Sequence, residues 1–294
     1  MPMNTTAKVF PGFWFGALLC LIVLAFQSLL IVPFVLVGML VKVPLMSHPA
    51  VLAFVNIAAF AVACVAGWFI GRVPLREWLP VRPVRAVLYP VAVLTCLGAV
   101  LVLSEVDNLL RVVLPMPKVI EDMFRELFNL TAHPLGAFFL LVIVAPVTEE
   151  ILFRGMILRG LRTRFSALKA VVACAFLFAC LHMNPWQFLG AFGLGLIFGW
   201  WLLRTNCLWL CLLGHAIANG SLFLASLLPW EIPGLTVGEG VVPQGFQPWW
   251  LDLTAVALLA LGLWLFHRLA PQPVPAAELP PALPPILPPA APGS

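Results

Sequence analysis

The stretch that decides the fold is AFFLLVIVAPVTEEILFRGMILRGL, residues 137–161, a long apolar run that contains the adjacent carboxylates Glu149 and Glu150. An apolar helix of about 20 residues is what crosses the roughly 30 Å hydrocarbon core of a bilayer. Ionisable groups inside such a helix are costly, and they usually face a partner or a cavity instead of lipid. The stretch therefore predicts a transmembrane helix with functional groups in its interior.

The composition of the whole chain agrees with a membrane protein. Of 294 residues, 63% are hydrophobic and 10% are charged, whereas a typical soluble domain is about 25% charged. Apolar runs predict eight spans, at residues 12–40, 51–71, 87–104, 135–157, 168–183, 186–203, 207–228 and 249–267. Because these runs are long and do not alternate, they favour an all-α, polytopic transmembrane helix bundle over a β-barrel.

Four segments follow from this pattern. Residues 1–130 hold N-terminal transmembrane helices and an amphipathic segment, residues 131–228 a polar-centred helical core, residues 229–268 a loop and the last span, and residues 269–294 a tail with ten prolines. Such a tail is typical of disordered or polyproline-like chain. The segment 118–130, KVIEDMFRELFNL, predicts either an amphipathic helix at the membrane interface or a short lid helix.

The basic residues predict an orientation in the membrane. With the N-terminus in the cytoplasm, 12 of the 16 lysines and arginines lie on the cytoplasmic side, as expected for a bacterial-type inner membrane. These are Lys8, Arg72, Arg76, Arg82, Arg85, Arg154, Arg159, Arg162, Arg164, Lys169, Arg204 and Arg268. Since the net charge is only +4 and lies in short loops, nucleic acid is not expected as a partner.

The two glutamates have different surroundings along their helix. Glu150 and Arg154 are four residues apart, so they lie on one face and can neutralise each other. Glu149 is rotated by about 100° and has no such partner. It is the better candidate for a general base. The alternative is that both carboxylates only mark a helix end near the lipid headgroups.

The next apolar helix places Phe178 and His182 on one face. If the chain reverses at residues 163–166, Glu149 and His182 each lie about 25 Å along their helices from the turn. Two antiparallel neighbours would then hold the carboxylate and the imidazole at one depth. A structural role for a single buried histidine is the alternative.

A third helix, ending LLGHAIANG, places His215 and Asn219 on a common face. Together the four groups predict a hydrolytic site, in which Glu149 and His182 activate water while His215 and Asn219 stabilise an oxyanion. Polar contacts that only join helices are the alternative for the last pair.

Zinc is a competing interpretation, because two histidines and a glutamate are common catalytic zinc ligands. Its ligands would be Glu149, His182, His215 and Asn219. The HExxH arrangement is absent and asparagine is an unusual ligand, so we expect no metal and no other cofactor.

The three motifs in this order resemble the CPBP family, which joins type II CAAX prenyl endopeptidases to bacteriocin-processing and related proteins. The motifs are EExxxR (Glu149, Glu150, Arg154), FxxxH (Phe178, His182) and HxxxN (His215, Asn219). The resemblance covers about residues 135–225. It implies a glutamate-dependent intramembrane endopeptidase with Glu150, Arg154 and Phe178 in supporting roles.

The implied substrate is a membrane-anchored peptide or protein, prenylated or otherwise anchored at its C-terminus. A second hypothesis keeps the same fold without catalysis, as a membrane scaffold, an immunity protein or a partner of a transporter.

Overall fold

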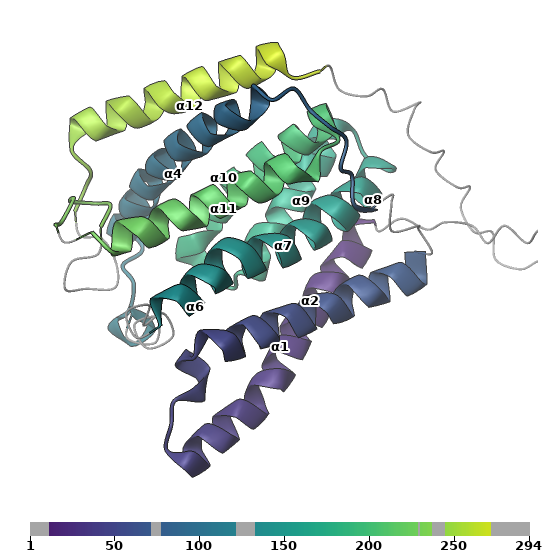
Figure 1. Ribbon diagram of the computed structural model, residues 1–294, viewed down its shortest axis with the longest axis vertical. Coiled ribbons are helices and arrows are strands. Elements are labelled where there is room, and N and C mark those ends of the chain that lie inside the picture. The colour runs from purple at the N-terminus through teal and green to yellow at the C-terminus, as the bar shows by residue number, and fades with distance from the viewer. Residues whose placement is uncertain (1–11, 72–77, 122–132, 229, 237–244, 272–294) are drawn as a thin grey trace, which may run out of the picture.

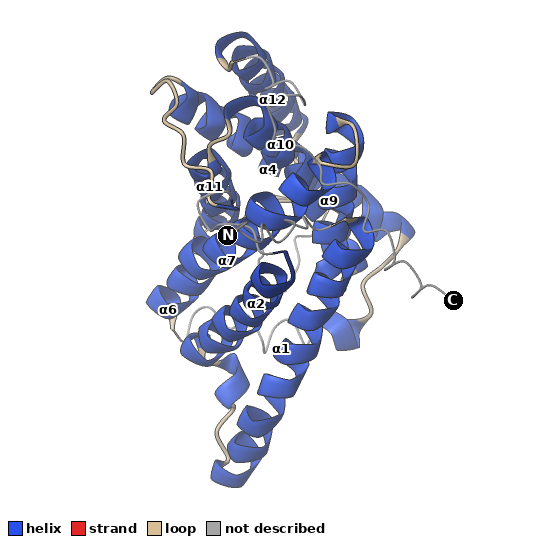
Figure 2. Cartoon of the chain, turned by 90° about the vertical axis from the view of Figure 1, so that its right-hand side faces the viewer, coloured by secondary structure: helices blue, strands red, loops and turns tan. Residues whose placement is uncertain are grey.

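The chain folds into a bundle of long helices in a computed structural model that describes residues 12–71, 78–121, 133–228, 230–236 and 245–271. The helices are α1 (Phe13–Val41), α2 (Pro49–Gly71), α4 (Leu88–Val113), α6 (Pro134–Phe138), α7 (Ala145–Glu150), α8 (Leu158–Arg162), α9 (Ala167–Leu181), α10 (Pro185–Thr205), α11 (Leu208–Ser226) and α12 (Trp249–Leu269). A short 3₁₀ turn, η1 (Leu45–Ser47), and two π-helical segments, η2 (Phe139–Val144) and η3 (Ile151–Ile157), complete the order. Most of the long helices lie side by side, and α1 projects beyond them (Figures 1 and 2).

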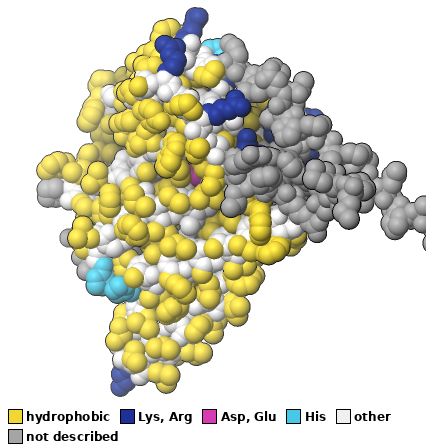
Figure 3. All heavy atoms as spheres, turned by 45° about the vertical axis from the view of Figure 1, so that its right-hand side comes forward, with side chains coloured by type: hydrophobic (Ala, Val, Ile, Leu, Met, Phe, Trp, Pro, Cys, Tyr) yellow, Lys and Arg dark blue, Asp and Glu magenta, His cyan; other side chains and the backbone are white. Residues whose placement is uncertain are grey.

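The fold is all-α and polytopic, as the sequence predicts. Seven helical stretches in the described chain are long and apolar enough to cross a membrane, with α6 to α8 forming one of them, Pro134–Arg162. The eighth expected span corresponds to α9, which has only 15 residues. The described residues contain no β-strand, only an isolated bridge between Val81 and Cys207. The protein is therefore an integral, multi-pass membrane protein, and the face of it seen in Figure 3 is mostly apolar where it is described.

The Pro134–Arg162 stretch is not a uniform α-helix, and Pro146 explains part of its irregularity. In η2 the backbone N–H of Ala145 donates to the carbonyl of Leu140, five residues earlier. The next N–H in that register would come from Pro146, which has none. The carbonyl of Leu141 is thereby left for another donor.

One end of the bundle carries most of the described lysines and arginines, and we call it the basic end. The backbone amide of Arg82 donates to the carbonyl of Asn206 at 3.4 Å, and Arg159 donates to the Asn206 side chain at 3.1 Å. Arg204 donates to the carbonyls of His267 and Ala270 at the C-terminus of α12, both at 3.0 Å. The described lysines and arginines in the loops and helix ends here are Arg82, Arg85, Arg159, Arg162, Arg164, Lys169, Arg204 and Arg268.

The opposite end is held by different contacts. Trp186, in the first turn of α10, donates from its indole nitrogen to the carbonyl of Leu114 at 2.7 Å. Asn108 of α4 donates to the carbonyl of Gly234 at 2.7 Å. This hydrogen bond attaches the loop between α11 and α12 to α4. The described basic residues at this end are Lys42, Arg111 and Lys118.

Two expected segments fall largely outside the described residues. Only residues 118–121 of the predicted amphipathic segment 118–130 are described, and they are helical. Of the proline-rich tail 269–294, the structure describes residues 269–271.

Helices α4 and α12 pack closely at glycines, which gives a test of the fold. A Cβ added at Gly98 would lie 2.8 Å from the Cα of Leu259, closer than real Cβ contacts, whereas one added at Gly190 meets nothing within 4 Å. We expect Gly98→Ala to lower the free energy of unfolding by about 1 to 3 kcal/mol through overpacking. Gly190→Ala, the matched control, should leave it unchanged or raise it slightly. Thermal unfolding in detergent measures both, and equal stability of the two variants would contradict the close packing.

Candidate active site

A buried ion pair forms the base of the site. Arg154 Nη1 lies 2.9 Å from Glu150 Oε1, and both side chains are fully buried. The guanidinium also stacks over the rings of Phe178 and Phe198, at 4.6 and 5.5 Å from their centroids. This confirms the predicted pairing of Glu150 with Arg154 and explains why the pair tolerates a dry environment.

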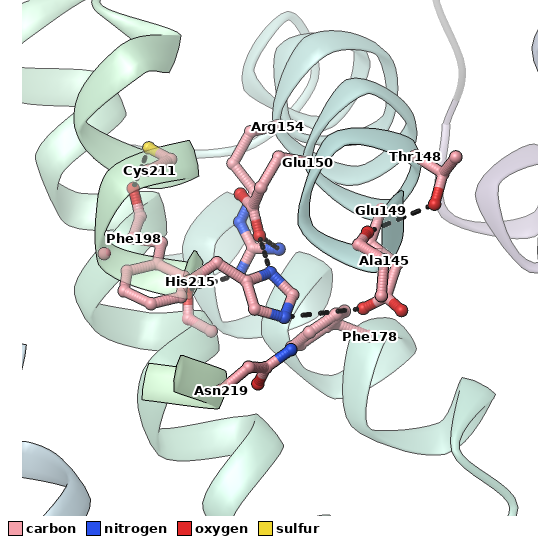
Figure 4. A network of polar contacts seen from close by, with 12 residues as sticks. Ala145, Thr148, Glu149, Glu150, Arg154, Phe178, Phe198, Cys211, His215 and Asn219 are labelled. Carbon is pink, nitrogen blue, oxygen red and sulfur yellow. Dashed lines mark hydrogen bonds and ion pairs between the residues drawn. The ribbon is translucent and has the colours of Figure 1, made fainter. Parts of the chain in front are cut away.

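His215 lies between the two glutamates (Figure 4). Its Nδ1 is 2.8 Å from Glu150 Oε1, and its Nε2 is 3.8 Å from Glu149 Oε2. The sequence alone does not indicate this contact, because it joins α7 to α11. It brings His215 to the two adjacent glutamates, so two of the four expected polar groups, Glu149 and His215, lie together.

The hydrogen-bond pattern fixes the tautomer of His215. Glu150 Oε1 accepts from Arg154, so it acts as a carboxylate acceptor and His215 Nδ1 must be a donor. Two carboxylates facing one guanidinium leave one negative charge, which is costly in a buried site. A hydrogen bond donated from Nε2 into the site would require a second proton on His215.

His182 ends α9 as its C-cap and is half-buried. Its Nδ1 lies 3.0 Å from the carbonyl oxygen of Phe178, which can only accept. In neutral His182 the hydrogen is therefore on Nδ1, and Nε2 is a proton acceptor. The Phe178 ring lies between the two imidazoles, 5.1 Å from that of His182 and 5.8 Å from that of His215.

The described contacts do not pair His182 with either glutamate within ion-pair distance; both glutamates face His215 instead. The shared depth of Glu149 and His182 stays a prediction. The turn that it assumed is present, since α8 ends at Arg162 and α9 begins at Ala167.

Asn219 supplies the donor that Leu141 lacks. Its Nδ2 donates to the Leu141 carbonyl at 2.9 Å, so α11 is attached to the irregular segment η2. The amide nitrogen carries two hydrogens, and the second remains for another acceptor. Asn219 therefore holds the helix that carries Glu149 while still offering a donor to the site.

One polar contact near the site lies outside all three motifs. Thr148, next to Glu149, donates from its hydroxyl to the Asn56 side-chain oxygen of α2 at 2.7 Å. The sequence feature that could have indicated this contact is Asn56, an asparagine inside an apolar span. Asparagine side chains often form hydrogen bonds between membrane helices.

Two of the four residues considered as zinc ligands are engaged in other contacts. His215 Nδ1 is bound to Glu150, and the amide of Asn219 to Leu141. In the described part of the chain, no group of three or more His, Cys, Asp or Glu side chains is arranged to hold a metal ion. A metal is not needed for the chemistry considered below.

Removing Arg154 tests the buried pair. Arg154→Met leaves Glu150 charged and unpaired, and we expect a loss of about 3 to 5 kcal/mol in the free energy of unfolding. The double variant Arg154→Met with Glu150→Gln should recover much of that loss because it removes the unpaired charge. Arg162→Met, a control near the surface, should change stability little. Thermal unfolding in detergent checks all three, and a double variant no more stable than Arg154→Met would argue against the pair.

Comparison with known proteins agrees with the motifs. Residues 131–221 match the family described as type II CAAX prenyl endopeptidase Rce1-like. No curated protein and no solved structure matches the chain. The matched segment contains Glu149, Glu150, Arg154, Phe178, His182, His215 and Asn219. The resemblance to the CPBP family of CAAX proteases is thus confirmed over the part of the chain that carries the whole candidate site.

Proposed function

We propose that the protein is an intramembrane endopeptidase that hydrolyses a peptide bond in a membrane-associated substrate. The observation that carries the proposal is the gap between Glu149 and His215. Glu149 Oε2 is buried without a hydrogen-bond partner and lies 3.8 Å from His215 Nε2. The proposal places the attacking water beside this pair, within hydrogen-bond distance of both atoms.

In the proposed reaction, Glu149 takes a proton from this water as its oxygen attacks the carbonyl carbon of the substrate. His182 Nε2, an acceptor, holds the second hydrogen of the water. The carbonyl oxygen becomes negative and receives hydrogen bonds from His215 Nε2–H and from the free Asn219 N–H. Glu149 then gives its proton to the leaving amine as the carbon–nitrogen bond breaks.

Glu150 and Arg154 do not touch the reacting atoms in this mechanism. Glu150 holds His215 by Nδ1, and Arg154 neutralises Glu150. Phe178 packs between the two histidines and keeps their rings apart. All three are positioning residues.

The proposed substrate is a membrane-anchored peptide or protein, prenylated or otherwise anchored at its C-terminus. We also propose a bacterial-type inner membrane with the N-terminus in the cytoplasm. The distribution of charge supports this orientation, because eight described lysines and arginines lie at the basic end and three at the opposite end.

Substitution of the proposed base tests the function. Glu149→Gln keeps the size of the side chain but cannot accept a proton, so cleavage should slow by at least about 100-fold. Mass spectrometry of membrane-protein termini, in cells that produce either the parent chain or the variant, should show termini that disappear with Glu149→Gln. Glu231→Gln, at an exposed position, is the matched control and should keep them.

Thermal unfolding of the same variants separates catalysis from a scaffold role. A folded Glu149→Gln protein that has lost its cleavage products supports the endopeptidase. Unchanged termini together with a lower unfolding temperature would instead favour a non-catalytic protein that uses the polar cluster for packing.

A further inference from the structure

Helix α7, Ala145–Glu150, is a six-residue α-helical segment between the π-helical segments η2 and η3. Because a π turn holds more residues than an α turn, each change between the two alters the direction in which the following side chains point. The geometry of a long regular helix therefore does not fix the direction of Glu149. Contacts between α7 and the neighbouring helices must fix it.

Two contacts hold α7 on nearly opposite faces. Thr148, Glu149 and Glu150 are successive residues, each rotated by about 100° from the one before. Glu150 points toward α11, where its Oε1 lies 2.8 Å from His215 Nδ1. Thr148 contacts α2 instead, with 2.7 Å between its Oγ1 and Asn56 Oδ1. Glu149 thus lies between the two attachment points (Figure 4).

The Thr148 hydroxyl does not need Asn56 as a partner. Its Oγ1 also lies 2.9 Å from the carbonyl oxygen of Val144, four residues earlier, an acceptor that threonine uses inside helices. A carboxamide is costly in an apolar span such as α2. A role in holding α7 explains why α2 carries Asn56 at this position.

The hydrogen bond differs in kind from the apolar packing between α2 and the stretch that carries the glutamates. At Gly67 of α2, for example, an added Cβ would lie 3.0 Å from Met156 Cε. Such packing fixes how closely two helices approach, but apolar attraction has no direction. A hydrogen bond has a preferred angle. The Asn56–Thr148 contact therefore restrains the rotation of α7 one residue away from Glu149.

We propose that Asn56 of α2 is a positioning residue for Glu149 and acts through Thr148. The inference rests on the proposed function, which gives the orientation of Glu149 a catalytic use. Without the hydrogen bond, α7 can turn about its remaining attachment at Glu150, and the 3.8 Å between Glu149 Oε2 and His215 Nε2 changes. A displacement of about 1 Å can slow catalysis about 100-fold. The functional unit then includes α2, which lies outside the matched residues 131–221.

Single substitutions test the role in catalysis, with a synthetic peptide that spans a bond protected by Glu149→Gln. Asn56→Leu and Thr148→Val each remove the hydrogen bond with little change in volume, and each should slow cleavage about tenfold or more. Thr148→Ser keeps the hydroxyl and should keep the parental rate. Thr254→Val is the matched control, because exposed Thr254 of α12 makes the same bond to the carbonyl four residues earlier, at 2.7 Å. It should leave the rate unchanged.

The double variant tests whether the two residues act together. If both act through one hydrogen bond, Asn56→Leu with Thr148→Val should be no slower than the slower single variant. Since neither side chain touches the substrate in the proposed reaction, kcat should fall while KM stays the same. The unfolding temperatures in detergent should stay near that of the parent chain. Losses that multiply in the double variant, or that follow the unfolding temperature, would overturn the inference.

Nitrogen NMR of labelled histidine gives a test that does not depend on activity. Glu149→Gln changes the group that faces His215 Nε2 and should shift its resonance. Asn56→Leu and Thr148→Val should each shift the same resonance, and Thr254→Val should not. An unchanged resonance in the first two variants would contradict the positioning role. If Glu149→Gln protects no bond, the proposed function fails, and the resonance alone decides whether Asn56 positions Glu149.

Discussion

The guanidinium of Arg154 is the group on which the arrangement of the site depends. It binds Glu150 within its own stretch, approaches the Gly195 carbonyl of α10 at 3.5 Å and stacks on Phe178 of α9. Through Glu150 it also fixes His215 of α11. A buried ion pair adds little net stability because desolvation opposes the attraction. We propose that its value here is specificity, because the guanidinium contacts α9 and α10 directly and α11 through Glu150.

The π-helical segments on both sides of α7 set the position of Glu149 within that arrangement. A π turn is wider than an α turn, and such turns are frequent at functional sites. Here Pro146 removes one backbone donor, and Asn219 replaces it from another helix at 2.9 Å. Irregular backbone inside a membrane requires such a replacement, because lipid offers no hydrogen bonds. The residue proposed to bind the oxyanion therefore also stabilises the segment that precedes the proposed base.

The sequence predicts features that depend on one helix and not those that depend on several. Apolar runs gave the spans, and the spacing of four residues gave the Glu150–Arg154 pair, because both follow from the geometry of a single helix. The contact of His215 with Glu150 depends on how two helices are rotated about their axes. That rotation is set by packing, for example at Gly195, where a Cβ would lie 2.9 Å from the Cβ of Ala175. The spacing of residues within one helix does not indicate how two helices pack against each other.

The low dielectric of the membrane favours chemistry that keeps the total charge of the site constant. In the reaction proposed above, Glu149 is the negatively charged base at the start. When Glu149 takes the proton of water, it becomes neutral and the oxyanion takes over its negative charge. The new charge forms beside His215, within a few ångströms of the old one. Burial, which is costly for an isolated charge, is thus compatible with hydrolysis because the reaction moves one negative charge over a short distance and creates none.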